Sequence, residues 1–360
     1  MPETKGLLRS KVTIGLLLLA AALVVFRAVI LPRIVLDYVN DKLDGMEDYQ
    51  GKVKDINLHL WRGAYDIIEL KLEKTGGRVP VPFIDVSRVE LSVQWSEVVH
   101  GSLVGDITFH EPRLNFVKGP TRETSQTTVT PSWIEITKDF FPFSINQLKA
   151  TDATIHYRDF HSEPEIDIYL DKVYLYATNL TNSRDVSQNK FARIEIYNKP
   201  GNNDPRVSVV VVLNTFEKKP TFDLRFSLND VNLVRMNDFF KAYGNFDVES
   251  GTFTLYSEIV ASKGAYEGYA KPLFDDLEVV DWKKDSKSML RLTWEAIVGA
   301  TAQILKSERT GKVATQVPIK GNFEDQNIDY WTAIGNLLRN AFIEAIRPTF
   351  EGITADKGSQ

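Results

Sequence analysis

Residues 221–229 read TFDLRFSLN, a stretch in which apolar and polar side chains alternate without a break. Successive side chains of a β-strand point to opposite faces of its sheet, so the stretch predicts a strand with one dry and one wet face. That pattern is typical of an antiparallel sheet that packs one face on a core. The dry face would carry four side chains: Phe222, Leu224, Phe226 and Leu228.

The same period of two recurs on both sides of this stretch. Residues 165–177 repeat it through Ile166, Ile168 and Leu170, and residues 251–262 repeat it through Phe253 and Leu255. Gly, Pro and Asp separate the runs. The sequence therefore predicts a mainly β fold with some helix, its strands lying at residues 53–60, 65–72, 84–94, 103–109, 113–117, 153–157, 165–177, 191–198, 207–213, 221–228, 251–262 and 313–323.

Helices and loops are expected between and after these strands. Residues 34–43 predict a short amphipathic helix that stops near Gly45, and residues 119–131, rich in Thr, Ser and Pro, predict an exposed loop. A turn with a short helix is expected at 231–243, and an apolar helix at 288–307. A last amphipathic helix would run from residue 329 to Pro348, either capping the open end of the sheet or lying on a membrane or a partner.

Residues 12–31, VTIGLLLLAAALVVFRAVIL, contain one charge in twenty positions. At 1.5 Å per helical residue they span ~30 Å, the thickness of a bilayer core. They predict a transmembrane anchor, with Arg27 extending its side chain to the headgroups. The alternative is a signal sequence cleaved near Ala20-Ala21-Ala22, but the apolar run continues past that point. The anchor residues would be Leu16, Leu17, Leu18, Leu19, Val24, Val25, Phe26 and Arg27.

Charge predicts the orientation of the anchor. Lys5, Arg9 and Lys11 precede it, and cationic flanks stay in the cytoplasm, so residues 1–11 are expected to be a cytoplasmic tail. Residues 1–31 hold four basic residues and one acidic residue, which leaves 39 Lys and Arg against 47 Asp and Glu, a net charge of −8. This balance argues against nucleic acid as a partner. The absence of cysteine excludes disulfides and thiolate metal sites.

No stretch matches a known catalytic motif. Thr310-Gly311-Lys312 lacks the upstream glycine of a phosphate-binding loop, and no serine elbow, zinc-protease helix or dinucleotide turn is present. The densest polar cluster is His156, Asp159 and His161, which we interpret as solvated residues at a strand end and not as metal ligands. We therefore expect no enzyme activity, no catalytic residues, no metal and no cofactor.

Several stretches together resemble a known family. After the anchor come VNDKLDGMEDYQGKVKDINLHLWRGAYDIIELKLEK and PVPFIDVSRVELSVQWSEVVHGSLVGDITFHEPRLNF, and later FDVESGTFTLYSEIVASKGAYEGYAKPLFDDLEV and VPIKGNFEDQNIDYWTAIGNLLRNAFIEAI. These resemble the AsmA-like envelope proteins, most closely the branch known as domain of unknown function 748. The resemblance implies a long, highly curved sheet, a groove or half-pipe with an apolar inner face. Residues 32–118 would form its first part, 132–347 the remainder with capping helices, and 348–360 a flexible tail.

Larger members of that family are linked to phospholipid movement between bacterial inner and outer membranes. The resemblance thus implies a periplasmic protein, anchored in the inner membrane, that binds or passes phospholipid or another envelope lipid and contributes to outer-membrane lipid homeostasis. About fifteen strands would stack to ~70 Å, enough for a partial conduit. The alternative is an anchored assembly factor with a self-filled core and an envelope protein as partner. The lipid-facing candidates are Phe222, Leu224, Phe226, Leu228, Phe253 and Leu255.

Overall fold

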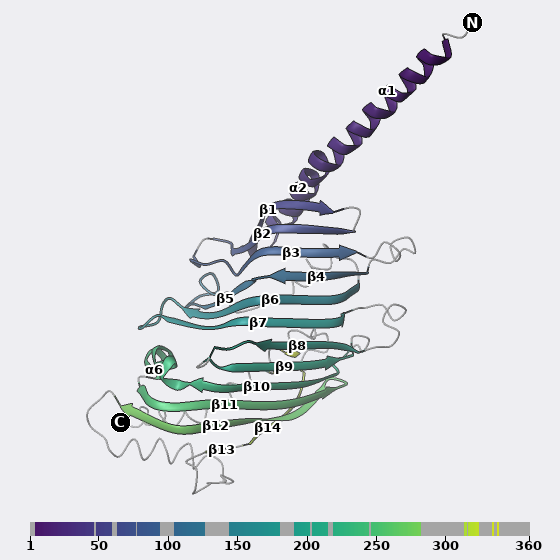
Figure 1. Ribbon diagram of the computed structural model, residues 1–360. Helices are drawn as coiled ribbons and strands as arrows, with labels where there is room; N and C mark the ends of the chain where they lie inside the picture. The colour runs from purple at the N-terminus through teal and green to yellow at the C-terminus, as the bar shows by residue number, and fades with distance from the viewer. Residues whose placement is uncertain are drawn as a thin grey trace.

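A long helix leads into a stack of strands in the computed structural model (Figure 1). The helix comprises α1 (Thr4–Val25), a π-helical turn η1 (Phe26–Ile30) and α2 (Leu31–Asp44). The structure describes residues 4–46, 48–59, 63–76, 78–93, 104–126, 144–180, 191–201, 204–214, 219–244, 246–281, 313–314, 316–323, 333–334 and 337. The apolar helix predicted at 288–307, Thr310-Gly311-Lys312 and the tail 348–360 lie outside these residues.

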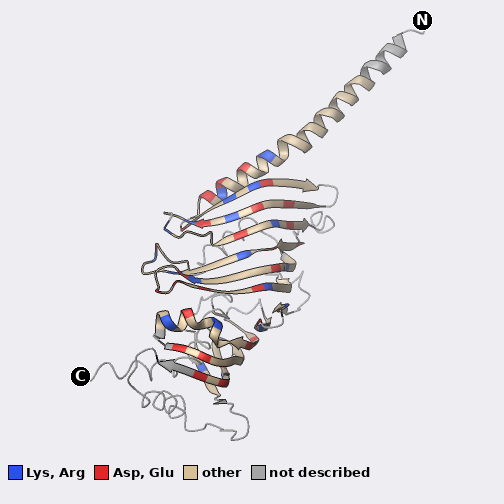
Figure 2. Cartoon of the chain, turned by 60° about the vertical axis from the view of Figure 1, so that its left-hand side comes forward, with Lys and Arg blue, Asp and Glu red and all other residues tan. Residues whose placement is uncertain are grey.

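The described helix Thr13–Asp44 is long and apolar enough to cross a membrane. Its apolar side chains project from the rest of the chain, for example Leu18 at 66% exposed and Phe26 at 45%. Among the described side chains, the coloured charges of the helix lie at its end beside the sheet (Figure 2). Pro32 explains the π-turn: proline has no backbone N–H, so the helical ladder shifts and Leu31 N–H donates to Phe26 O, five residues back. The side chain of Arg27 lies outside the described part.

Fourteen strands of the described chain form one mixed sheet, ordered β1-β2-β3-β4-β6-β7-β8-β9-β10-β11-β12-β13, with β14 on β12 and β5 between β3 and β6. Their pairings are antiparallel except β4–β6 and β5–β6, which are parallel. The strands are β1 (Tyr49–His59), β2 (Ala64–Lys74), β3 (Ile84–Val93), β4 (Val104–His110), β5 (Arg113–Lys118), β6 (Ser144–Asp159), β7 (Ile166–Leu180), β8 (Ala192–Asn198), β9 (Arg206–Leu213), β10 (Phe222–Asn232), β11 (Phe246–Ser262), β12 (Ala265–Asp281), β13 (Val313–Ala314) and β14 (Val317–Asn322).

The mainly β fold and the long antiparallel sheet are confirmed. The twelve strands of the main path stack to about 50 Å at ~4.8 Å per strand, less than the ~70 Å expected from fifteen. The helix expected at 34–43 is α2, which ends at Gly45. The turn and short helix expected at 231–243 are η3 (Leu233–Met236) and α6 (Asn237–Gly244).

A line of backbone kinks crosses the sheet. Glu69, Asp152, Lys172, Asp230 and Asp276, in five different strands, all have φ between +47° and +60°. Register shifts accompany the kinks in the β6–β7 and β10–β11 pairs and near the kink in the β11–β12 pair. Such bulges bend a strand and increase its twist, so a line of them curves the whole sheet into a trough.

The kinks also reverse the side-chain alternation. In β7, Ile166 and Leu170 lie on the same face as Val173 and Ala177, although Val173 is three positions after Leu170 and strict alternation would place it on the opposite face. The left-handed backbone of Lys172 between them exchanges the two faces. The expectation of an unbroken period of two through residues 165–177 is therefore wrong beyond Leu170.

Helix α2 covers β1, the first strand of the sheet. Leu43 of α2 lies so close to β1 that a Cβ added at Gly51 would be 2.8 Å from Leu43 Cβ. The side-chain amide of Asn40 pairs with the edge of β1, donating to Val53 O at 3.2 Å and accepting from Val53 N–H at 2.7 Å. This helix therefore protects a sheet edge that would otherwise be open for pairing.

The loop expected at 119–131 is exposed only in part. Thr121 and Arg122 are exposed, but Gln126 is 1% exposed and its amide donates to Asn115 O at 2.8 Å. Gln126 also forms a bridge with Val117 of β5. The expectation is thus wrong at Gln126, because this residue satisfies backbone groups beneath the loop. Residues 127–131 lie outside the described part.

Candidate functional site: the inner face of the sheet

The inner face, defined here as the face on which Leu224 lies, carries apolar rows that run across the whole sheet. One row follows the paired positions from β1 to β14, and all its members are apolar except Gly268, which has no side chain. The pairings between successive strands from β7 to β12, and of β12 with β14, continue the row to its far end. Its members are Leu58, Tyr65, Leu91, Ile107, Leu148, Ala177, Ile194, Val211, Leu224, Ile259, Gly268 and Ile319.

A second row lies beside the first along the same strands and pairings. Ser257 is its one polar member among the described residues, and the Ser257 hydroxyl donates to Tyr269 O at 2.8 Å. The row comprises Ile56, Ile67, Val89, Phe109, Ala150, Leu175, Ile196, Val209, Phe226, Ser257, Ala270 and Val317. An apolar surface therefore runs continuously from the strand beside α2 to the far end of the sheet.

Both ends of this surface are covered by the chain itself. At the first end, Leu43 and Met46 pack with Phe83 and the inner residues of β1 to β4. At the other end, Ala333, Ile334 and Leu337 are 0–7% exposed and pack onto β7 to β11. These three residues belong to the predicted final helix, so its described part caps the sheet; the remainder, including Trp331 and Leu338, lies outside the described residues.

Most of the residues predicted to face lipid lie in these covered regions. Leu224 is 0% exposed, Leu255 1%, Phe222 3% and Phe253 4%. Phe222 also contacts the ring of Phe323, with 6.4 Å between ring centroids, and Phe253 packs against Phe274 at 5.0 Å. η3 and α6 contribute Leu233 and Phe240 to the same cluster as Phe253 and Leu255. Phe226 and Leu228 are partly buried. The structure thus brings the six candidates together on one face.

Between the two covered ends, the inner face is only partly covered. We define the central patch as Leu114 of β5, Ile155 and Tyr157 of β6, and Ile168 and Leu170 of β7. All five are partly buried, and none belongs to the buried clusters at either end. Their pairings, Leu114 with Ile155 and Ile155 with Leu170, place them side by side. Among the described residues, this patch is a partly exposed apolar part of the inner face that lies outside the three apolar clusters.

A buried carboxylate lies beside the central patch. Asp159 is 5% exposed; its Oδ2 accepts from the Tyr243 hydroxyl at 2.6 Å and its Oδ1 from the N–H groups of His161 and Ser162. Burial raises the pKa of Asp159, but these hydrogen bonds and the charge of Lys118 outweigh burial and lower it below the ordinary value. Burial and the Asp159 contact raise the pKa of Tyr243. The bond joins α6 to the β6–β7 turn.

His156, Asp159 and His161 are not brought together as metal ligands. His156 is on the outer face, where its Nδ1 lies 2.7 Å from Asp167 Oδ1, and Arg158 also pairs with Asp167 at 3.1 Å. Burial raises the pKa of Asp167, but the hydrogen bonds from His156 and Arg158 outweigh burial and lower it. Within the described residues, no group of three or more His, Asp or Glu is arranged to hold a metal ion.

The six lipid-facing candidates predicted from the sequence do lie on the inner face, but most of them lie where the chain itself covers that face. Ile168 and Leu170 belong to an alternating stretch, and Leu114 and Ile155 lie in the strands predicted at 113–117 and 153–157, but the sequence does not indicate that these four residues share the inner face. The described part of the chain is a mainly β protein with a long curved sheet and one helix long and apolar enough to cross a membrane. No protein-family model matches the chain, and no curated protein matches it.

Proposed function

We propose that this protein is anchored in a bacterial inner membrane and holds phospholipid acyl chains against the inner face of a periplasmic sheet. The observation that carries the proposal is the pair of apolar rows that begin beside α2 and run from β1 to β12 and on to β14 without a charged residue. A lipid that moves along these two rows would meet no charged side chain within them. By binding or passing phospholipid in this way, the protein would contribute to outer-membrane lipid homeostasis.

The central patch is where lipid contact would begin. Burying a methylene group against apolar side chains contributes ~0.8 kcal/mol, and Ile155, Ile168 and Leu170 offer surface that the chain leaves partly open. At the covered ends an acyl chain would have to displace the capping segments, including Leu337 over β7 to β11. The proposed transport therefore needs the caps to move, whereas binding at the patch does not.

Photocrosslinking tests the proposal directly. A photoreactive phenylalanine analogue replaces Leu170 or Leu228 on the inner face, and Tyr169 as the matched control, because Tyr169 is adjacent to Leu170 but is 61% exposed on the outer face. Illumination of cells followed by mass spectrometry should give phospholipid adducts at 170 and 228 and far fewer at 169. Absence of adducts at both inner positions, with the variants folded, would contradict lipid binding.

A second candidate function is an anchored assembly factor that acts on an envelope protein. It is favoured by the packing of Phe222, Leu224, Phe253 and Leu255 into cores that the chain fills itself. The two functions differ in what a deletion changes. Altered phospholipid distribution between the membranes supports lipid transport, whereas normal lipids with defective assembly of one envelope protein support the assembly factor.

A further inference from the structure

The outer face of the sheet carries a second ordered pattern, unrelated to the apolar rows. One cross-strand row from β7 to β12 reads Tyr174, Tyr197, Ser208, Ser227, Tyr256 and Lys271. Aromatic residues therefore lie on β7, β8 and β11, and serines lie on the two strands between. Tyrosine combines an apolar ring with a polar hydroxyl, and such residues are enriched at binding interfaces.

We call this row the outer-face trough: its tyrosines are on β7, β8 and β11, and its two serines lie between those of β8 and β11. Tyr174 and Tyr197 stack with 5.6 Å between ring centroids and 15° between ring planes. Tyr197 is paired on its other side with Ser208 of β9. Tyr197 and Tyr256 are each 41% exposed. Their strands are three spacings apart, roughly 14 Å, and Ser208 and Ser227 fill the interval with small hydroxyl groups.

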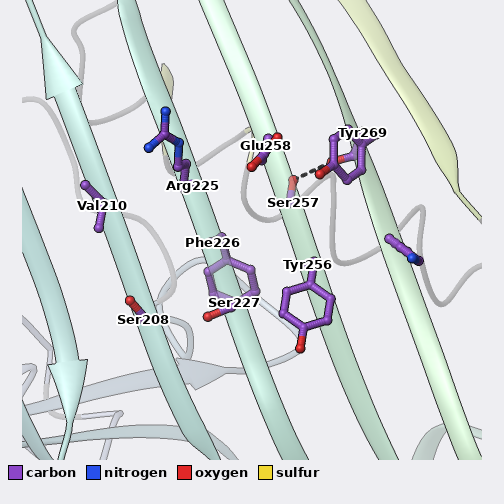
Figure 3. A pocket seen from close by; sticks show the side chains of 10 residues that line it. Ser208, Val210, Arg225, Phe226, Ser227, Tyr256, Ser257, Glu258 and Tyr269 are labelled. Carbon is purple, nitrogen blue, oxygen red and sulfur yellow. Dashed lines mark hydrogen bonds between the residues drawn. The ribbon is translucent and has the colours of Figure 1, made fainter.

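A depression of about 320 Å³ occupies the β9 to β12 part of this trough (Figure 3). Ser208, Ser227 and Tyr256 line it, together with Arg225, Glu258 and Tyr269. Its volume falls at the lower end of the range for small-molecule sites. The described chain thus combines exposed aromatic rings, hydroxyl groups and a hollow in one place.

The charges around the trough match a neutral ligand. From β8 to β12, the serine row and the adjacent row contain Arg225 and Lys271 as cations and Glu195 and Glu258 as anions. Glu195 accepts from Arg193 at 2.6 Å, and Arg225 donates to Asp223 at 3.4 Å. Each of these two pairs is neutral, so Lys271 and Glu258 contribute one charge of each sign. An anionic ligand such as a phosphate would find no excess of positive charge. A neutral ligand would find both donors and acceptors.

We propose that this outer-face trough binds a neutral oligosaccharide. The C–H faces of the sugar rings pack on Tyr197 and Tyr256, and the sugar hydroxyls bond with Ser208, Ser227 and the paired charges. The ~14 Å interval between the strands of Tyr197 and Tyr256 accommodates a short run of sugar units. The proposal is independent of lipid binding, because it concerns the opposite face of the sheet.

The test is binding of cellotetraose and chitotetraose to the full chain in detergent micelles, measured by saturation-transfer NMR and calorimetry. At least one of these neutral oligosaccharides should bind saturably. Tyr197→Ala and Tyr256→Ala should each weaken binding at least tenfold, and Ser227→Trp should abolish it by filling the interval between these two tyrosines with both of them kept. Tyr169→Ala, which removes an exposed tyrosine outside the trough, should leave binding unchanged. Thermal unfolding of each variant verifies that it is folded.

Three outcomes would overturn the proposal. The first is no saturable binding of either oligosaccharide to the wild-type chain. The second is binding that survives Ser227→Trp and both tyrosine variants in folded protein. The third is binding of anionic tetragalacturonate that is as tight as that of the neutral sugars, because the charge balance then has no role in selection.

Discussion

Asp159 is the residue whose ionisation links two distant segments. Its carboxylate is held by Tyr243 of α6 and by the backbone of the β6–β7 turn, and Lys118 lies 4.0 Å from the Tyr243 ring centroid. Sequence reasoning noticed Asp159 only as part of a histidine-rich turn. Its partner is 84 residues away, and no local pattern indicates such a pairing.

Asp159 should make stability depend on pH in acid. Its pKa in the folded chain lies below the ordinary 3.8, so the carboxylate stabilises the fold above about pH 4, and that contribution is lost as the pH falls through the folded value. Thermal unfolding from pH 7 to pH 2.5 should show Asp159→Asn less stable than wild type at pH 7, with the difference narrowing below pH 4. A difference that is constant with pH would contradict this assignment.

Because two inner-face leucines differ in burial, their replacement by alanine should lower the free energy of unfolding by different amounts. Leu224 is 0% exposed in a self-filled core, so Leu224→Ala should lower the free energy of unfolding by about 2–5 kcal/mol. Leu170 in the central patch is only partly buried, so Leu170→Ala should cost clearly less. Urea unfolding in detergent measures both. Equal losses would mean that the patch is packed as tightly as the core.

At the scale of the element, the kinks have a sequence signature that a period-two reading misses. Apolar inner-face residues are three positions apart at the kink, as in Ala150 to Ala153, Leu170 to Val173 and Leu228 to Val231. In each case the third residue of the four, Asp152, Lys172 or Asp230, has positive φ. Asp adopts this conformation more readily than most residues, but Lys does not, and only the three-residue spacing indicates the kink.

Lys172 offers a clean test of the kink because its side chain is exposed. Lys172→Val should destabilise the fold by about 1–2 kcal/mol or more, since β-branched residues are strained at positive φ. Lys172→Gly should be neutral or stabilising. The control is Glu267, exposed in β12 with ordinary strand backbone, where Val should be better tolerated than Gly. The same order of stability at both sites would contradict a backbone origin.

At the scale of the whole molecule, the sequence indicated the sheet, the anchor and the dry face, because these depend on local period and length. It did not indicate what covers the dry face. Leu337 packs in the same cluster as Leu224, 113 residues earlier in the chain, and the parallel pairing of β6 with β4 changes the strand direction where no local signal marks it. Coverage depends on contacts between segments that are distant in sequence.

Among the described residues, one core at the first end of the sheet is separate from two adjoining cores at the other end, which predicts unfolding in more than one step. The first core joins α2 to β1–β4, and the second joins β7–β11 to the final helix; the central patch between them is only partly buried. Val86→Ala, in the first core, should lower the urea concentration at the midpoint of one transition, and Leu224→Ala should lower the midpoint of another. Hydrogen exchange read by mass spectrometry assigns each transition. A single transition that both variants shift equally would show one cooperative unit.

The line of kinks also bears on how such a protein can change in evolution. Five of the described strands carry a kink, and in the β6–β7 hairpin the kinks of the two strands lie side by side, so a kinked hairpin is a unit of the curved sheet that can be repeated. An inserted hairpin that kept the three-residue spacing in both strands would add roughly 10 Å of length and leave the cross-section as it was. The length of the curved sheet and its cross-section can therefore change independently in evolution. Duplication of a kinked hairpin would lengthen the sheet without changing what its inner face can hold.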